Sequence, residues 1–574
     1  MKRRLVLFIT LILAVFPASA YTNNAIIFPS SDPVYSDMDS LYAEASLVRP
    51  SGNRPWSEAE ARKLLSAVDR NSLGEYGMKL YDKIEERIER GLRWNWGEDF
   101  SLTVGLEIAP EGYFHTNDES FITETDWERS YDERTSLLCL YIETGANDNF
   151  YLTSDIHYRY RRADRLDVFT PYSTTDGGRL TSDGYVASYK IDDGSFVSRS
   201  HFFSEKAMSN AFSDTTHFSF IWPRRAVFSF GGRDWNFSIS RDYLSLGNAY
   251  FGNLLVDDHT FSDYSKLTFF SPFFRFDSVL MFLNTAVNPG EHMDKEGRIY
   301  LIHTLQFRIL DRVSLTVSEN VMYKYKTLSL MYFNPSYIYH NINNRSMFNA
   351  FLYLDVNVLL MKGFEFYGQF AMDQARAPNE DDSQSNSMGF VTGLSYRKPV
   401  HDGTLLLYAE YTKTMPLLYR RDEVDFIRTY RYNAVNADAY FVTYFDYIGF
   451  PYGGDTRMLE IKGKYTSLDS WEASLFTRFV QKGEVNIFTS HNTEGKNDGW
   501  ANLSGDTPYG DRVRYFMVIG LEGASSLSSL FSWPEVSFSF ELDWISRFIY
   551  TKSTQAVTER ENDLQLTLGL KISV

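Results

Sequence analysis

Residues 564–574, Leu-Gln-Leu-Thr-Leu-Gly-Leu-Lys-Ile-Ser-Val, decide the fold class. An apolar residue stands at every second position from Leu564 to Val574, and the positions between them are polar, charged or glycine. Successive side chains of a β-strand point to opposite faces, so this stretch predicts a strand with one apolar and one polar face. The same alternation recurs at 102–108, 352–360, 364–372 and 536–544.

The length of these alternating stretches indicates a membrane. A tilted strand needs about 9–11 residues to cross a bilayer, whereas strands of soluble proteins most often have about 5–6. In an outer-membrane barrel the apolar face meets lipid and the polar face lines the interior. We therefore predict an all-β transmembrane β-barrel of about 18 antiparallel strands over residues 96–574, located in the bacterial outer membrane.

Short and long connections alternate between the predicted strands. The short ones include 146–149, 310–312, 362–363, 399–403 and 468–470, and the long polar ones include 116–134, 162–184, 241–263, 324–347, 374–387, 415–455 and 483–511. Outer-membrane barrels have short periplasmic turns and long extracellular loops. We count about 18 strands if 185–203 form an extracellular hairpin, and about 20 if they cross the membrane. Glu319 falls on the apolar face of its strand, which predicts a bulge before it or a position above the apolar band.

The first residues have the pattern of an export signal. Basic residues at 2–4 precede an apolar run over 5–16, and residues 18–20, Ala-Ser-Ala, resemble a cleavage site. We expect residues 1–20 to be a secretory signal peptide, with an N-terminal anchor helix as the alternative.

Residues 21–95 carry a helical pattern. Asp32 is an N-cap candidate followed by proline, and Ser57 with Glu60, and Ser72 with Glu75, have the spacing of capping boxes. We expect an N-terminal segment of three short helices in the periplasm. It is either a bundle with its own core or a plug or docking module, because amphipathicity alone does not distinguish these.

Composition and missing motifs argue against several classes of function. The 574 residues include 57 Lys and Arg against 74 Asp and Glu, a net charge of −17, which argues against nucleic acid as a partner. HExxH, GxSxG and Walker A motifs are absent, and the ten histidines are scattered. We therefore expect no enzyme activity, no cofactor and no metal. The one cysteine, Cys139, is expected to pack as a small residue, and His157, near Asp155, to belong to a mixed polar lumen wall.

The long loops are rich in tyrosine, tryptophan, arginine and acidic residues, which suit stacking on sugar rings and pairing with sugar hydroxyls or acidic groups. The alternative is that the aromatic residues form the interface girdles of a barrel. The candidate polysaccharide-binding residues are Arg233, Arg241, Asp242, Tyr243, Tyr250, Tyr323, Tyr325, Arg431 and Trp500.

Three ordered groups of residues resemble the Wzi family of outer-membrane proteins, which attach capsular polysaccharide to the bacterial surface. They are 31–35 with 55–60; Gly232-Arg233 with 241–247 and 252–255; and 318–321, 332–335, 354–355 and 367–370 with Asp373. The resemblance implies a barrel of about 18 strands, a helical bundle at its periplasmic end and a lectin-like surface role. One departure is Leu246-Gly247, where Trp-Gly is expected, so the ligand can differ.

These observations favour a non-enzymatic barrel that binds and retains surface polysaccharide, capsule or exopolysaccharide, through its extracellular loops. Its other expected partners are outer-membrane lipids and the outer-membrane assembly machinery. One alternative is a porin-like diffusion channel, in which the acidic chain would favour cations. A second is a barrel hydrolase, which lacks a recognisable nucleophile and base.

Overall fold

The structure of the protein is a computed structural model. It describes residues 23–96, 99–121, 126–129, 133–159, 184–190, 196–201, 208–211, 224–284, 297–325, 329–339, 348–374, 386–421, 424–433, 440–468, 471–487, 507–527 and 534–574. The expected signal peptide and Trp500 lie outside these residues.

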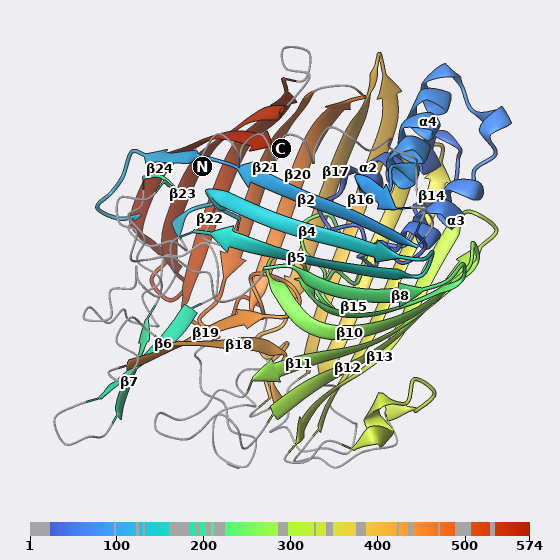
Figure 1. Ribbon diagram of the computed structural model, residues 1–574. Coiled ribbons are helices and arrows are strands. Elements are labelled where there is room, and N and C mark those ends of the chain that lie inside the picture. The colour runs from blue at the N-terminus through green and yellow to red at the C-terminus, as the bar shows by residue number, and fades with distance from the viewer. Residues whose placement is uncertain are drawn as a thin grey trace, which may run out of the picture.

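The chain forms a closed antiparallel barrel of 18 strands, as predicted (Figure 1). Each strand pairs with the next along the sheet, and β24 pairs with β2 to close it. The strands are β2 (Phe100–Ile108), β4 (Leu138–Ala146), β5 (Phe150–Tyr158), β8 (Ala226–Gly231), β9 (Trp235–Tyr243), β10 (Phe261–Phe270), β11 (Phe274–Asn284), β12 (Gly297–Ile309), β13 (Val313–Tyr325), β14 (Phe348–Met361), β15 (Phe364–Gln374), β16 (Ser387–Val400), β17 (Gly403–Thr414), β20 (Thr456–Ser467), β21 (Trp471–Lys482), β22 (Arg512–Ser526), β23 (Glu535–Thr551) and β24 (Ala556–Ser573). Two short strands extend the seam, β1 (Trp94–Trp96) beside β2 and β3 (Glu111–His115) beside β24.

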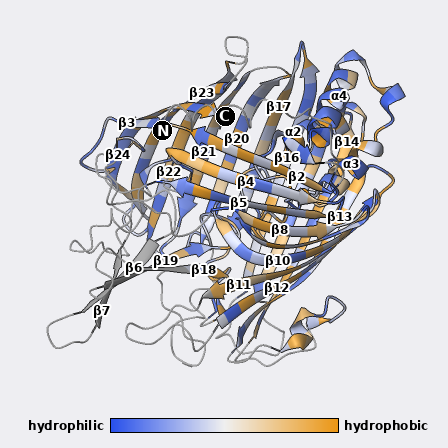
Figure 2. Ribbon diagram, in the orientation of Figure 1, coloured by the Kyte–Doolittle hydropathy of each residue, from blue (hydrophilic) through white to orange (hydrophobic). Residues whose placement is uncertain are grey.

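The barrel is apolar outside and polar inside. On β24, Leu564 and Leu568 are 42% and 38% exposed, whereas Gln565 and Thr567, facing the interior, are 2% and 6% exposed. Figure 2 shows apolar and polar residues alternating along the strands around the wall. This is the distribution of a protein whose outer face meets lipid. Among the described residues, no helix is both long and apolar enough to cross a membrane.

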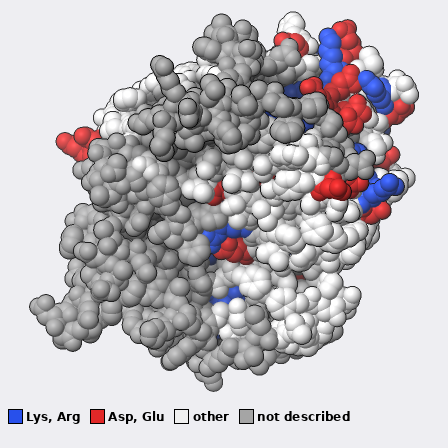
Figure 3. Space-filling model, in the orientation of Figure 1, with Lys and Arg blue, Asp and Glu red and all other residues white. Residues whose placement is uncertain are grey.

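Three α-helices cover the end of the barrel that carries the short turns. They are α2 (Pro33–Glu44), α3 (Glu58–Ser66) and α4 (Glu75–Glu89), with a 3₁₀ turn, η1 (Arg70–Ser72), before the last. Asp39 of α2 is ion-paired with Arg397 near the end of β16, and Lys63 of α3 with Asp234 in the β8–β9 turn. Figure 3 shows charged side chains gathered over this helical end beside a mostly uncharged wall.

The helix starts largely follow the sequence. Asp32 and Ser57 accept hydrogen bonds from the backbone N–H groups of Val34 and Glu60, as N-caps do. The expected cap at Ser72 is wrong. Ser72 belongs to η1, and α4 begins after Gly74, whose missing side chain makes no capping bond.

The other end of the barrel carries a second, four-stranded sheet, called here the loop sheet. It consists of β6 (Gly184–Lys190), β7 (Phe196–His201), β18 (Ile427–Asn433) and β19 (Tyr440–Tyr447), in the order β18-β19-β6-β7. The hairpin at 184–201 therefore does not cross the membrane, which decides between the two strand counts. Strands β18 and β19 lie within 415–455, which the sequence predicts to be a long polar connection.

The outer wall is covered at one place by residues 329–339, called here the wall flap, which include the 3₁₀ turn η5 (Leu330–Phe333). Tyr339 of the flap stacks on His303 of β12, with 4.3 Å between ring centroids, and its hydroxyl lies 3.0 Å from the His303 Nε2. His303 is directly opposite Glu319 of β13, and the ladder on both sides of Glu319 is regular. The predicted bulge is therefore absent, and these polar residues sit on the outward face next to a covering segment.

Candidate functional site: the filled lumen and the loop sheet

Several chain segments fold into the barrel interior and pack as a core. The largest hydrophobic cluster includes Leu246, Leu254 and Val256, from the β9–β10 connection, and Tyr419 and Phe450, from the β17–β20 connection. All are almost completely buried. We call residues 48–57, 244–260, 415–421, 424–426 and 448–455 the lumen segments. Because apolar side chains fill the space between them, the interior resembles the core of a soluble domain.

On one side, the lumen segments are tied to the wall around Arg49. Its guanidinium Nε donates to Glu365 of β15 at 2.7 Å, and its Nη2 donates to Asn357 of β14 at 3.1 Å. The guanidinium also lies 4.5 Å from the ring centroid of Tyr250, which itself stacks on Tyr408 of β17 at 4.5 Å. Buried charges of this kind are tolerated because they are paired and hydrogen-bonded.

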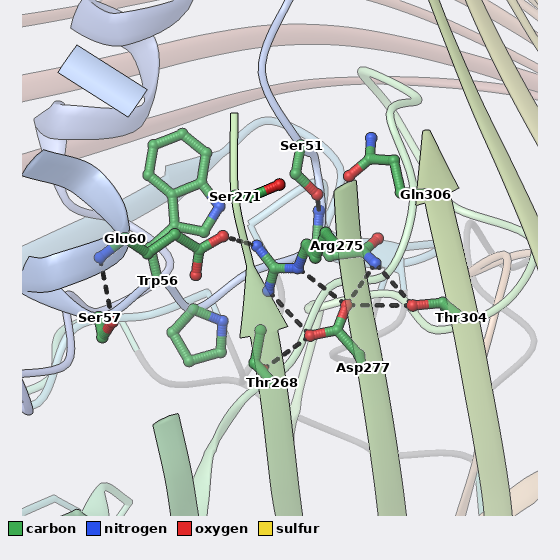
Figure 4. A network of polar contacts seen from close by, with 12 residues as sticks. Ser51, Trp56, Ser57, Glu60, Thr268, Ser271, Arg275, Asp277, Thr304 and Gln306 are labelled. Carbon is green, nitrogen blue, oxygen red and sulfur yellow. Dashed lines mark hydrogen bonds and ion pairs between the residues drawn. The ribbon is translucent and has the colours of Figure 1, made fainter. Parts of the chain in front are cut away.

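A second network joins α3 to the wall (Figure 4). Arg275 of β11 lies between Glu60 of α3 and Asp277, with Nε of Arg275 2.9 Å from Oδ2 of Asp277. The same Asp277 oxygen accepts a 2.8 Å bond from Asn53 Nδ2 and a 3.0 Å bond from Thr304. Burial raises the pKa of Glu60, although Arg275 acts against it.

A third network attaches the lumen segments to strands β20 and β21 of the wall. Arg478 of β21 is ion-paired with Glu460 of β20 at 2.6 Å, and also with Glu128, between β3 and β4. Its guanidinium lies 4.1 Å from the ring centroid of Phe251. The lumen segments are therefore bonded to strands around the circumference of the barrel.

Two of the cavities formed by the described residues lie beside this packing. The larger, of about 1260 Å³, lies between α4 and the strands β2, β4, β5 and β24, and its lining includes Glu89, Glu143 and Asp155. The smaller, of about 410 Å³, lies between β20–β24 and the segment with Glu128 and Arg129. The larger cavity is lined by ten acidic and five basic residues, so it favours cations.

The predicted site residues on β9 point to different sides of the wall. Arg241 and Tyr243 face outward, and Arg241 makes a two-pronged ion pair with Asp263 of β10 at 2.6 and 2.7 Å. Asp242 faces inward, is fully buried, and is paired with Arg225 at 3.1 Å. The period of two along β9 separates them.

Tyr250 lies within the lumen segments, as described above. Tyr323 and Tyr325 share the outward face of β13, and Tyr323 stacks on Phe348 at 4.5 Å within the cluster under the wall flap. Tyr323 is thus a wall residue next to the flap rather than a loop residue.

Arg233 lies in the β8–β9 turn, at the helical end and opposite the long connections. Arg431 lies in β18, at the position directly opposite Thr443 of β19. The polysaccharide-binding role of all nine candidates stays a prediction. Of the eight candidates that the structure describes, Arg241 lies near Tyr243 and Tyr323 near Tyr325, but the eight do not form one site.

The register of the loop sheet aligns tyrosines that lie far apart in the sequence. Tyr430 of β18 is directly opposite Tyr444 of β19, which is directly opposite Tyr185 of β6. Tyr440 of β19 is likewise opposite Tyr189 of β6. Positions two apart in a strand share a face, so one face of the sheet has a run of tyrosine positions contributed by two distant loops.

A histidine fixes this sheet to the lumen segments. Nε2 of His259 lies 2.8 Å from Asp446 of β19, and its Nδ1 lies 3.1 Å from Asp257. Arg428 of β18, also buried, pairs with the same Asp446 at 3.2 Å. Burial lowers the pKa of His259, but Asp446 and the hydrogen bonds to both aspartates outweigh it and raise the pKa to about 10.

Comparison with known proteins supports the fold. No protein-family model and no curated protein matches the chain. Wzi, an outer-membrane protein involved in group 1 capsule assembly in Escherichia coli and a carbohydrate-binding β-barrel, is similar over 95% of this chain and 99% of its own, with 12% identity and a TM-score of 0.51.

Two further outer-membrane protein structures are less similar. OprD of Pseudomonas aeruginosa has 8% identity and a TM-score of 0.35, over 82% of this chain and 94% of its own. The outer-membrane channel DcaP of Acinetobacter baumannii has 10% identity and a TM-score of 0.33, over 84% of this chain and 100% of its own. The likeness to Wzi shows the fold alone, so the protein is an outer-membrane β-barrel and membership of the Wzi family stays a prediction.

Proposed function

We propose that this barrel binds surface polysaccharide at its loop end and retains it on the cell. The observation that carries the proposal is the run of tyrosine positions on one face of the loop sheet, formed by Tyr430, Tyr444 and Tyr185 in register. Aromatic rings with a polar tip can stack on a sugar ring and hydrogen-bond to its hydroxyls. A repeating polymer is suited to a row of such rings.

The filled lumen supports the same proposal. Opening a path would separate ion pairs such as Arg49–Glu365 and Arg478–Glu460, whose side chains are all buried. Removing one partner of such a pair costs about 3–5 kcal/mol. The lumen segments therefore act as a rigid base for the loop sheet, which His259 attaches to them.

The test is polysaccharide binding by the purified protein in detergent, with retention of polysaccharide on cells as a second readout. The variant Tyr430→Ala/Tyr444→Ala removes two of the tyrosines aligned on one face of the loop sheet. The matched control is Phe441→Ala, because position 441 is three residues from Tyr444 and therefore lies on the opposite face of β19. We expect the double variant to bind at least about tenfold more weakly, which is about 1.4 kcal/mol. Equal binding by the double variant, or no binding by the unchanged protein, would refute the proposal.

The acidic larger cavity favours a second candidate, a narrow cation-selective channel. Planar-bilayer recording distinguishes the two. Steady conductance with cation preference supports the channel, and a silent bilayer together with polysaccharide binding removes it. The barrel-hydrolase hypothesis is checked by turnover of lipid and peptide substrates.

A further inference from the structure

Three metal-binding side chains converge on the inner wall where β4 pairs with β5. Cys139 is directly opposite His157, and Asp155 lies two residues before His157 on the same face. The Cys139 Sγ is 3.6 Å from the His157 Nε2, and the Asp155 Oδ2 is 2.8 Å from that same nitrogen. These ligand atoms all lie within 4.8 Å of one another. We propose that the three residues bind one zinc ion, a site that is independent of polysaccharide binding.

The separations suit a tetrahedral ion. Zinc lies about 2.3 Å from a thiolate sulfur and about 2.0–2.1 Å from an imidazole nitrogen, so the two ligand atoms are about 3.6 Å apart. The sulfur and nitrogen are 3.6 Å apart here. Oδ2 of Asp155 and Nε2 of His157 are now at hydrogen-bond distance, 2.8 Å. To bind the same ion they need to move apart by about 0.5 Å.

The atoms that would not bind the ion are held by other partners. Nδ1 of His157 lies 2.8 Å from the Ser136 hydroxyl, and Oδ1 of Asp155 accepts a 2.9 Å hydrogen bond from the backbone N–H of Arg225. This leaves Nε2 and Oδ2 directed at a common point, together with the sulfur. Metal sites characteristically orient their ligands through such outer contacts.

Charge also favours a dication. The ligand side chains would be a thiolate, a carboxylate and a neutral imidazole, and Cys139 and Asp155 are only 8% and 9% exposed. Two carboxylates in this region are paired with cations, Glu107 with Lys571 at 2.6 Å and Asp242 with Arg225 at 3.1 Å. A bound Zn²⁺ neutralises the two ligand charges.

The proposed site has access and an open position. Cys139 and Asp155 both line the larger cavity, next to α4 at the helical end. Three protein ligands leave the fourth position of a tetrahedral ion for water. The sulfur and nitrogen ligands select zinc over calcium or magnesium, which prefer oxygen.

The test is titration of the full-length, folded protein in detergent with Co²⁺, an optical substitute for zinc. Cys139 is the only cysteine in the chain, so a thiolate-to-cobalt charge-transfer band can arise only there. We expect the band to saturate at one ion per chain, to disappear when Zn²⁺ is added, and to be absent from Cys139→Ser. Zinc is also expected to protect the thiol from alkylation.

Three variants and a control complete the experiment. Asp155→Asn and His157→Gln are expected to weaken cobalt binding strongly, and Ser136→Ala to weaken it about 10–100-fold. His401→Gln, in the β16–β17 turn, is the control and should bind as the unchanged protein does. Folding is checked for each by the heat-dependent gel shift of a barrel. The absence of a charge-transfer band and of thiol protection in the unchanged protein overturns the proposal, as does unaltered affinity in folded His157→Gln.

Discussion

Arg49, in the segment between α2 and α3, is ion-paired with Glu365 of β15, 316 residues later in the chain. The carboxylate accepts twice, since Oε1 takes the Arg49 backbone N–H at 2.9 Å and Oε2 takes Nε at 2.7 Å. Both side chains are buried. This contact fixes the N-terminal segment inside the barrel, and it joins the helical end to the lumen segments.

Glu365→Gln is expected to destabilise the protein by about 3–5 kcal/mol, because it leaves the Arg49 charge buried without its partner. The measurement is denaturant unfolding in detergent micelles. Glu75→Gln is the control, because Glu75 pairs with Lys79 on the exposed face of α4 and its loss should leave the midpoint unchanged. Equal midpoints for both variants would contradict the structural importance of the Arg49–Glu365 pair.

The attachment of the loop sheet should weaken at high pH. The pKa of His259 is raised above its ordinary 6.5 to about 10, so its contribution is complete below about pH 6.5 and is lost as the pH rises through 10. We compare thermal unfolding of the unchanged protein and His259→Asn across this range. Their melting temperatures should differ most at pH 6 and converge near pH 10. A difference in melting temperature that grows with pH would contradict a raised pKa of His259 in the folded protein.

Gly247→Ala should loosen the lumen segments. Gly247 has a φ of +141°, and a Cβ there would lie 2.3 Å from Oδ1 of Asn253 and 2.5 Å from the Tyr353 hydroxyl. Such strain costs about 1–3 kcal/mol. We expect a lower unfolding midpoint and more frequent conductance events in planar bilayers. Gly368→Ala, where the nearest atom is 3.4 Å from the added Cβ, should behave as the unchanged protein.

Tyr339→Ala should destabilise the outer wall. Tyr339 stacks on His303 and hydrogen-bonds to it, and its loss uncovers His303 on a face where Leu305 and Phe307 are exposed. Truncating a buried aromatic costs about 3–5 kcal/mol. Unfolding from lipid bilayers measures it, with Ile338→Ala as the control because Ile338 is largely exposed. Equal effects of the two substitutions would mean that the flap does not cover the wall.

Much of the barrel could be predicted because its information is local. The alternation from Leu564 to Val574 specifies a strand and both of its faces without reference to any other part of the chain. The N-caps at Asp32 and Ser57 are equally local. The Ser72 cap failed because Asp69 caps a 3₁₀ turn that includes Ser72, and the Ser72 hydroxyl donates to the Asp69 carbonyl.

The candidate site was less predictable because register and chain folding decide it. Neither the pairing of Tyr430 with Tyr444 and Tyr185 nor that of Cys139 with His157 follows from sequence spacing, since a shift of one residue would move each partner to the other face. Arg233 resembled a residue of a long loop, whereas the strand bounds place it in the short β8–β9 turn at the helical end.

The sequence by itself therefore determined the class of fold, a barrel with an apolar outer face, because hydrophobic periodicity acts on each strand separately. Only the tertiary structure decided that the lumen is filled, which loops form a sheet, and which polar groups meet. These depend on contacts such as Arg49 with Glu365, between residues far apart in the chain, whose free energy is gained only after the barrel has brought them together.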